Sequence, residues 1–144
     1  MALETQPSPV IRELDERECW AYLQRHEVGR VAVAAGGDIG IYPVNYLAEW
    51  GRIRFRTDPG AKLFELMLDS RVAFEIDGQD ADSAWSVLVR GTAKEVELSP
   101  DRVSAARLPE TPWVPGPRKA VVDITPVTVT GRLFLRTPPQ PVED

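Results

Sequence analysis

The stretch from Pro43 to Lys62, which reads PVNYLAEWGRIRFRTDPGAK, holds the side chains best suited to chemistry in this sequence. Arg56 and Thr57 end a predicted strand, Gly60 lies in the following turn, and Lys62 falls in the first turn of a predicted helix. A helix start presents unpaired amide donors and a partial positive charge, to which cations and a hydroxyl add strong hydrogen bonds. This combination suits a phosphate monoester. A solvated basic strand beside an ordinary helix cap is the other interpretation.

Other kinds of catalysis find little support in the composition. The sequence has one histidine, His26, and one cysteine, Cys19, which excludes a site of several imidazoles, a thiolate zinc site and an internal disulfide. We expect both residues to be structural, and we expect no metal site. Because no acid, base or nucleophile stands out, we name no catalytic residue, and a cofactor would have to carry any reaction.

Length, composition and charge restrict the class of protein. A chain of 144 residues, 43% hydrophobic and 27% charged, can bury the core of one domain but not of two ordinary ones. Its formal charge of −5 argues against non-specific binding to nucleic acid or anionic lipid. The sequence shows neither a basic and apolar leader nor a run of about 18 uncharged apolar residues. We therefore expect a soluble, cytoplasmic protein.

The predicted elements surround the Pro43 to Lys62 stretch. We expect a flexible tail over residues 1–12, one domain over residues 13–136 and a proline-rich tail over residues 137–144. A helix should run from the N-cap Asp15 to about His26, and short helices should follow Gly60 and Ser99. Alternating β-formers predict six strands: two flanking a turn at 36–38, then 52–57, 71–77, 85–98, and a last strand of 120–124 and 127–135 interrupted at Pro126.

The order of these strands predicts the fold class. Strands joined by short connections form antiparallel sheets, and closure into a small barrel removes the exposed edges of such a sheet. A β-sandwich is the structural alternative. Within residues 52–57 the alternation places three arginines on one face and Ile53, Phe55 and Thr57 on the other, and we expect Gly91 to bend the long strand of residues 85–98.

Several motifs in order give the chain a family resemblance. They are Gly-Arg-Val-Ala at 29–32, Pro-Val-Asn-Tyr at 43–46, Phe-Arg-Thr at 55–57 followed by Gly60 and Lys62, and Trp-Ser-Val-Leu-Val-Arg-Gly at 85–91. From about Leu14 to Leu133 the sequence resembles the flavin-binding split-barrel proteins of the pyridoxamine 5′-phosphate oxidase type. The resemblance implies a mainly β fold, a six-stranded antiparallel split barrel with short flanking helices.

The same resemblance implies a site for flavin mononucleotide (FMN) at a homodimer interface. Arg56, Thr57 and Lys62, with Gly60 in the turn, would hold the phosphate, while Pro43, Val44 and Asn45 would border the isoalloxazine ring. The second subunit would deliver Trp85 and Ser86. An asparagine amide can both donate to and accept from the polar pyrimidine edge of a flavin, although it could equally cap a turn. Trp85 could equally be core, and Arg132 resembles a C-terminal family signature but could be an exposed strand arginine.

Two departures limit the activity that the resemblance implies. Tyr46 and Ala61 stand where the vitamin-processing oxidases have Lys and Arg, so oxidation of pyridoxamine 5′-phosphate is not expected. We predict an FMN-dependent oxidoreductase that transfers hydride or electrons to or from a small planar substrate. The alternatives are a reductase using a 5-deazaflavin coenzyme, whose acidic tail would need a groove of Arg30, Arg52 and Arg54, and a non-enzymatic module binding flavin, haem or nucleotide.

Overall fold

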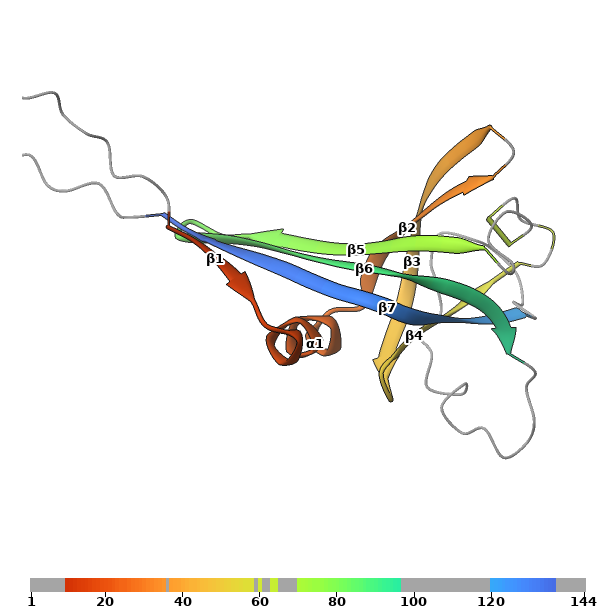
Figure 1. Ribbon diagram of the computed structural model, residues 1–144, viewed down its shortest axis with the longest axis horizontal. Coiled ribbons are helices and arrows are strands. Elements are labelled where there is room, and N and C mark those ends of the chain that lie inside the picture. The colour runs from red at the N-terminus through yellow and green to blue at the C-terminus, as the bar shows by residue number, and fades with distance from the viewer. Residues whose placement is uncertain are drawn as a thin grey trace, which may run out of the picture.

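The computed structural model describes residues 10–35, 37–58, 60, 63–64, 70–96 and 120–136. Its strands form one antiparallel sheet in the order β1-β7-β4-β3-β2-β5-β6, and β6 also pairs with β7, so the sheet closes (Figure 1). The predicted mainly β, split-barrel fold is confirmed. The elements are β1 (Val10–Leu14), α1 (Glu16–Arg25), β2 (Val28–Ala35), β3 (Asp38–Glu49), β4 (Arg52–Thr57), β5 (Arg71–Gln79), β6 (Ser83–Val96) and β7 (Ala120–Leu135).

Strand β7 closes the barrel. Residues 120–124 pair with β4 on one side, while β7 pairs with β6 over nearly its whole length on the other. We expected Pro126 to interrupt this strand, but β7 runs through it. Arg90 pairs with Thr128 and Gly91 with Pro126, so Val127 is an extra residue in β7, and this bulge lies where we expected Gly91 to bend β6.

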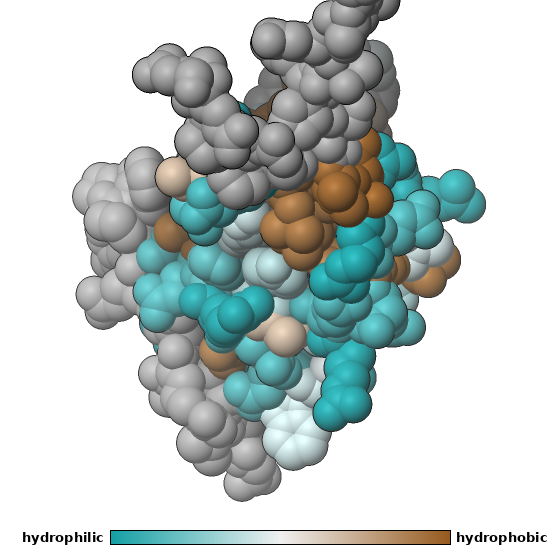
Figure 2. Space-filling model, turned by 90° about the vertical axis from the view of Figure 1, so that its left-hand side faces the viewer, coloured by the Kyte–Doolittle hydropathy of each residue, from teal (hydrophilic) through white to brown (hydrophobic). Residues whose placement is uncertain are grey.

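The predicted number of six strands was wrong, because the described residues form seven. The missed strand is β1, whose first residues we had placed in the tail, and Val10–Leu14 pairs with the end of β7. Only Leu14 of β1 is buried, so the sequence has no alternating pattern that could reveal a strand. Val10, Ile11 and Leu135 are exposed where β1 meets β7, and Figure 2, which faces this end, shows hydrophobic surface among hydrophilic residues.

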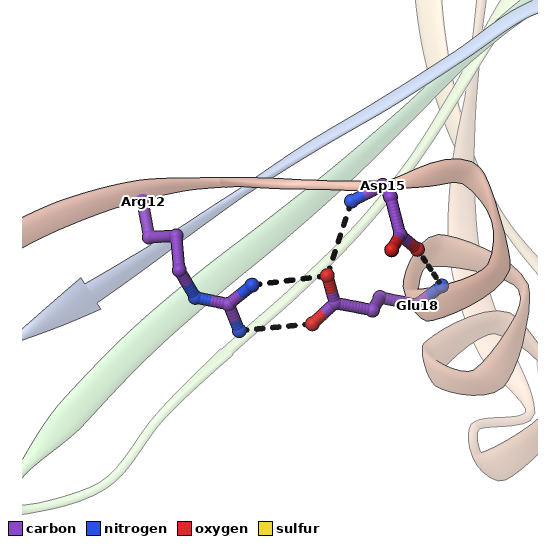
Figure 3. Close-up of polar contacts among 3 residues, drawn as sticks. All are labelled: Arg12, Asp15 and Glu18. Atoms are coloured by element: carbon purple, nitrogen blue, oxygen red, sulfur yellow. Dashed lines mark hydrogen bonds and ion pairs between the residues drawn. The ribbon is translucent and has the colours of Figure 1, made fainter.

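Helix α1 begins with the predicted cap. The Asp15 carboxylate accepts a hydrogen bond from the backbone N–H of Glu18 at 2.7 Å, and the Glu18 carboxylate accepts one from the backbone of Asp15 at 3.2 Å (Figure 3). Arg12 of β1 binds the same Glu18 carboxylate through two nitrogens at 2.9 Å. This ion pair lowers the pKa of Glu18. The contact fixes the start of the helix to the strand that precedes it.

Helix α1 packs against β3 and β7 and completes the core at that side of the barrel (Figure 1). Cys19 and Leu23 are fully buried, and the buried hydroxyl of Tyr46 donates to the Leu23 carbonyl at 2.8 Å. A Cβ added at Gly131 of β7 would lie 2.8 Å from the Cys19 sulfur, so the helix sits directly on that glycine. Burial raises the pKa of the Cys19 thiol, consistent with the predicted structural role.

Other predicted helices fall largely outside the described residues. Of the helix expected after Gly60, Leu63 and Phe64 are described and are helical, and the helix expected over residues 99–108 is not described. In the parts of the chain that are described, no helical segment combines the length and apolarity that crossing a bilayer requires.

The predicted alternation of β4 is confirmed. Ile53 and Phe55 are fully buried in the barrel, and the intervening arginines point outward. Arg54 binds Asp123 of β7 through two nitrogens, at 2.6 and 2.8 Å, with only 14% and 7% of the two side chains exposed. This ion pair joins the two strands at the point where the barrel closes.

The close approach of Gly91 in β6 to the bulged part of β7 leads to a first testable prediction. A Cβ at Gly91 would lie 2.2 Å from the Thr125 carbonyl oxygen, whereas one at Gly37 would meet nothing within 4 Å and would suffer only from its φ of +86°. We expect Gly91→Ala to reduce the free energy of unfolding by about 3 kcal/mol or more and Gly37→Ala by about 1 kcal/mol, measured by urea unfolding. Equal losses would show that β6 does not approach β7 as described.

The ion pair between Arg54 and Asp123 leads to a second testable prediction. Asp123→Asn removes the carboxylate that binds the largely buried Arg54 guanidinium in two places, so we expect a loss of about 2–3 kcal/mol in the free energy of unfolding. The double variant Arg54→Met/Asp123→Asn removes the charge as well and should be less destabilised than Asp123→Asn alone. Arg30→Gln, in an exposed ion pair, should cost about 0–1 kcal/mol. A double variant no more stable than Asp123→Asn would contradict this role.

Candidate functional site

Asn45 and Arg56 lie next to each other on neighbouring strands. Tyr46 of β3 pairs with Phe55 of β4, and both side chains are buried in the barrel. Asn45 precedes Tyr46 and Arg56 follows Phe55, so the two are adjacent and point to the outer face. Each of the two residues also takes part in at least one further interaction within the chain. The residue predicted for the ring edge and one predicted for the phosphate therefore share one corner of the barrel.

The other two candidates for the ring lie on opposite faces of β3. The side chain of Pro43 points outward, like that of Asn45, and is exposed. Val44 is 4% exposed and belongs to the hydrophobic core. Only the backbone of Val44 is therefore available to a ligand on the outer face, while Pro43 and Asn45 can offer side chains.

Thr57 ends β4 at the same corner. It is 7% exposed and pairs with Ala120 at the start of β7. The backbone N–H of Gly60 donates to the Asp58 carboxylate at 2.9 Å, so one amide of the turn is already occupied within the chain. Lys62 lies outside the described residues. The structure thus brings Arg56 beside Asn45 on the outer face, places the Thr57 side chain on the inward face at the end of β4, and leaves Lys62 as a prediction.

Trp85 and Ser86 point to opposite faces of β6, as consecutive strand residues must. Trp85 stacks on Tyr22 of α1, with ring centroids 4.5 Å apart, and its ring also lies 4.7 Å from that of His26. This packing within one chain corresponds to the core interpretation of Trp85. Ser86 lies on the outer face, where β6 pairs with β5 on one side and Ser86 pairs with Arg132 of β7 on the other.

Three arginines of the outer face are compensated by carboxylates. Arg30 contacts Glu75 at 3.1 Å and Asp77 at 3.2 Å. Burial, and next the hydrogen bond with Asp77, raises the pKa of Glu75. Arg52 lies 3.7 Å from the same Asp123 carboxylate that binds Arg54. These side chains do not form the open basic groove that a 5-deazaflavin coenzyme with an acidic tail would need.

One feature of the outer face was missed by the sequence analysis. A groove of about 700 Å³ lies over β2, β5, β6 and β7, and its lining includes Arg71 and Arg90. The two arginines are nearly 20 positions apart in the sequence, and only the β5–β6 register brings them together. The alternation of each strand indicates that its arginine points outward. No local sequence pattern indicates that Arg71 and Arg90 lie close together.

Comparisons with known proteins agree with this fold. The family model of pyridoxamine 5′-phosphate oxidase matches residues 15–141. A Corynebacterium glutamicum protein classed with the pyridoxamine 5′-phosphate oxidases is 37% identical, with a TM-score of 0.77, over 88% of this chain and 99% of that one. The FAD binding protein from Mycobacterium smegmatis is 29% identical, with a TM-score of 0.70, over 87% of this chain and 99% of that one.

A sequence relative supports the same assignment. An uncharacterized protein of Mycobacterium tuberculosis is 36% identical over 126 residues, which cover 83% of this chain and 82% of the relative. The family match extends over most of the chain and includes every described residue assigned to the corner of β3 and β4. The chain therefore belongs to the pyridoxamine 5′-phosphate oxidase family and has its flavin-binding split-barrel fold.

Proposed function

We propose that the protein is an FMN-dependent oxidoreductase, with the flavin ring against Pro43 and Asn45 and the phosphate near Arg56 and Thr57. The observation that carries this proposal is the adjacency of Asn45 and Arg56 on neighbouring strands. An amide for the ring and a cation for the phosphate then lie at one corner of a rigid barrel. The family's flavin-binding fold supports the same ligand class.

The flavin, when bound, supplies the redox chemistry. The protein's part is to bind and orient. The Asn45 amide can donate to one polar atom of the pyrimidine edge and accept from another, which fixes the ring in its plane. Pro43 offers an apolar surface that excludes water from one side. Hydrogen bonds to the pyrimidine edge also favour the more anionic reduced form, because donors stabilise negative charge in a site with little water.

The phosphate would be held by groups of different strength. Arg56 offers a guanidinium that can bind two phosphate oxygens from the outer face. The Thr57 hydroxyl points inward, and because Thr57 ends β4 we propose that it donates one hydrogen bond at the end of the barrel. Lys62 is proposed as a second cation. Gly60 is proposed to let the chain approach the phosphate closely, and not as a donor, because its N–H already binds Asp58.

The relative from Mycobacterium smegmatis is a FAD binding protein, which makes FAD a second candidate. FAD contains the same isoalloxazine ring and the same first phosphate as FMN. The same residues would therefore hold the ring and that phosphate in either cofactor. The mass of the molecule released from the purified protein distinguishes the two. The 5-deazaflavin alternative is less favoured, because Arg30, Arg52 and Arg54 all have carboxylate partners.

We further propose that the protein is a cytoplasmic homodimer with the cofactor at its interface. Val28 pairs with Asn45 and is 49% exposed, and Ile41, beyond Pro43, is 66% exposed. Exposed apolar side chains beside the proposed ring site favour cover by a second copy. In that arrangement Ser86 of one copy, and Trp85 if its ring is released from Tyr22, would complete the site of the other.

The phosphate assignment is tested by Thr57→Val combined with Lys62→Ala. We expect FMN binding to weaken by about 2–4 kcal/mol, because one charge-assisted and one neutral hydrogen bond are lost, while riboflavin affinity stays nearly unchanged. Fluorescence titration measures both ligands. Thr130→Val, an exposed strand threonine on β7, is the matched control and should change neither. Equal losses for FMN and riboflavin would contradict phosphate contact.

The enzymatic role is tested by electron transfer. The FMN-loaded protein is reduced anaerobically with dithionite and mixed with a soluble quinone as a planar acceptor. We expect the bound flavin to be reoxidised at a rate that saturates with quinone, and Asn45→Ala to slow that rate, because the ring loses its orientation. A linear, unsaturated dependence equal to that of free reduced FMN would favour the non-enzymatic binding module.

A further inference from the structure

The groove on the outer face has the size and lining of a small-molecule site. Its volume of about 700 Å³ lies within the range of about 300–1,000 Å³ that is usual for such sites. The lining includes the small side chains of three alanines, Ala32, Ala34 and Ala73, which leave the space over this part of the sheet open. Ile39 and Val127, which also line it, are 83% and 76% exposed. The groove therefore offers apolar surface to a ligand.

Two arginines give this apolar groove a localised positive charge. Arg71 pairs with Thr92 and Ala73 pairs with Arg90, so Arg71 and Arg90 are diagonal neighbours on the same face of β5 and β6. Diagonal neighbours have backbones about 7–8 Å apart, which lets two long side chains reach one head group. Within the described ranges neither guanidinium has a carboxylate partner, in contrast to Arg30.

Uncompensated cations beside apolar surface define the chemistry of a ligand. An apolar body removes the groove lining from water, and an anionic end group supplies the missing partner through charge-assisted hydrogen bonds. The hydroxyls of Thr92 and Thr128, which also line the groove, can donate to the same oxygens. We propose that the groove binds an elongated apolar molecule ending in one carboxylate or similar anionic group, with that group held between Arg71 and Arg90.

The register places this groove beside the proposed flavin site. Pro43 pairs with Arg30, and the next outward pair along the same strands is Ile41 with Ala32. Ala32 continues across the sheet to Ala73, which pairs with Arg90. Successive outward pairs are about 7 Å apart, so the groove begins one pair away from Pro43. A ligand in the groove would lie at the side of the ring away from Arg56. This placement rests on the proposed function, whereas anion binding in the groove does not.

The test uses the full chain and a defined probe. Decanoate is titrated into the protein by isothermal calorimetry, once without flavin and once with saturating FMN, and decyltrimethylammonium is titrated as a probe with the same chain length and opposite charge. We expect saturable decanoate binding in both conditions and no saturable binding of the cation.

Variants locate the binding. Arg71→Gln/Arg90→Gln should weaken decanoate binding about tenfold or more, while FMN affinity stays within twofold. Arg17→Gln/Arg25→Gln, two exposed arginines of α1, removes the same charge elsewhere and should leave decanoate binding unchanged. Ala32→Phe fills the groove without changing charge and should also abolish binding. Thermal unfolding of each variant shows whether it is folded.

Three results would overturn the proposal. They are equal binding of the two probes, unchanged decanoate affinity in a folded Arg71→Gln/Arg90→Gln variant, and a variant whose only defect is a weaker dimer in sedimentation experiments. The last result would assign the groove to contact between two copies of the chain. Failure of FMN to bind while decanoate binding persists would reject the proposed function and leave this inference standing.

Discussion

The backbone pairing of β7 with both β4 and β6 is the interaction on which the rest of the structure depends. Without it the sheet would have two exposed edges, and the buried faces of β3, β4 and β6 would lose their common core. The Arg54–Asp123 pair reinforces one side of this closure, and the close approach of Gly91 to Thr125 permits the other. A single long strand thus holds together a barrel assembled from distant segments.

Closure also determines where a ligand could bind. Inward positions are filled by core side chains, so polar groups can gather only on the outer face or at the corner where β3 and β4 meet. Asn45 and Arg56 lie at that corner because their neighbours Tyr46 and Phe55 are buried. The bulge in β7 lies on the same outer face, and its extra residue Val127 lines the groove that contains Arg71 and Arg90.

The fold class and most elements were predictable from local patterns. The capping residues Asp15 and Glu18 marked the start of α1, and the alternation of β4 separated its arginines from the core. Strand β1 was missed because an exposed edge strand has no buried face to produce a pattern. The adjacency of Asn45 and Arg56 follows from a hairpin and was accessible to sequence reasoning. The Arg71–Arg90 pair and the stacking of Trp85 on Tyr22 depend on tertiary register and were not.

Binding of a flavin nucleotide at the corner of β3 and β4 can be tested residue by residue with nitrogen–proton NMR spectra recorded with and without FMN. We expect the largest shift changes at the side-chain amide of Asn45 and at the backbone amides of Thr57 and Gly60. Residues of α1 far from that corner, such as Arg17, should be nearly unaffected. Saturable shifts confined to another part of the barrel, or no shifts at saturating FMN, would contradict it.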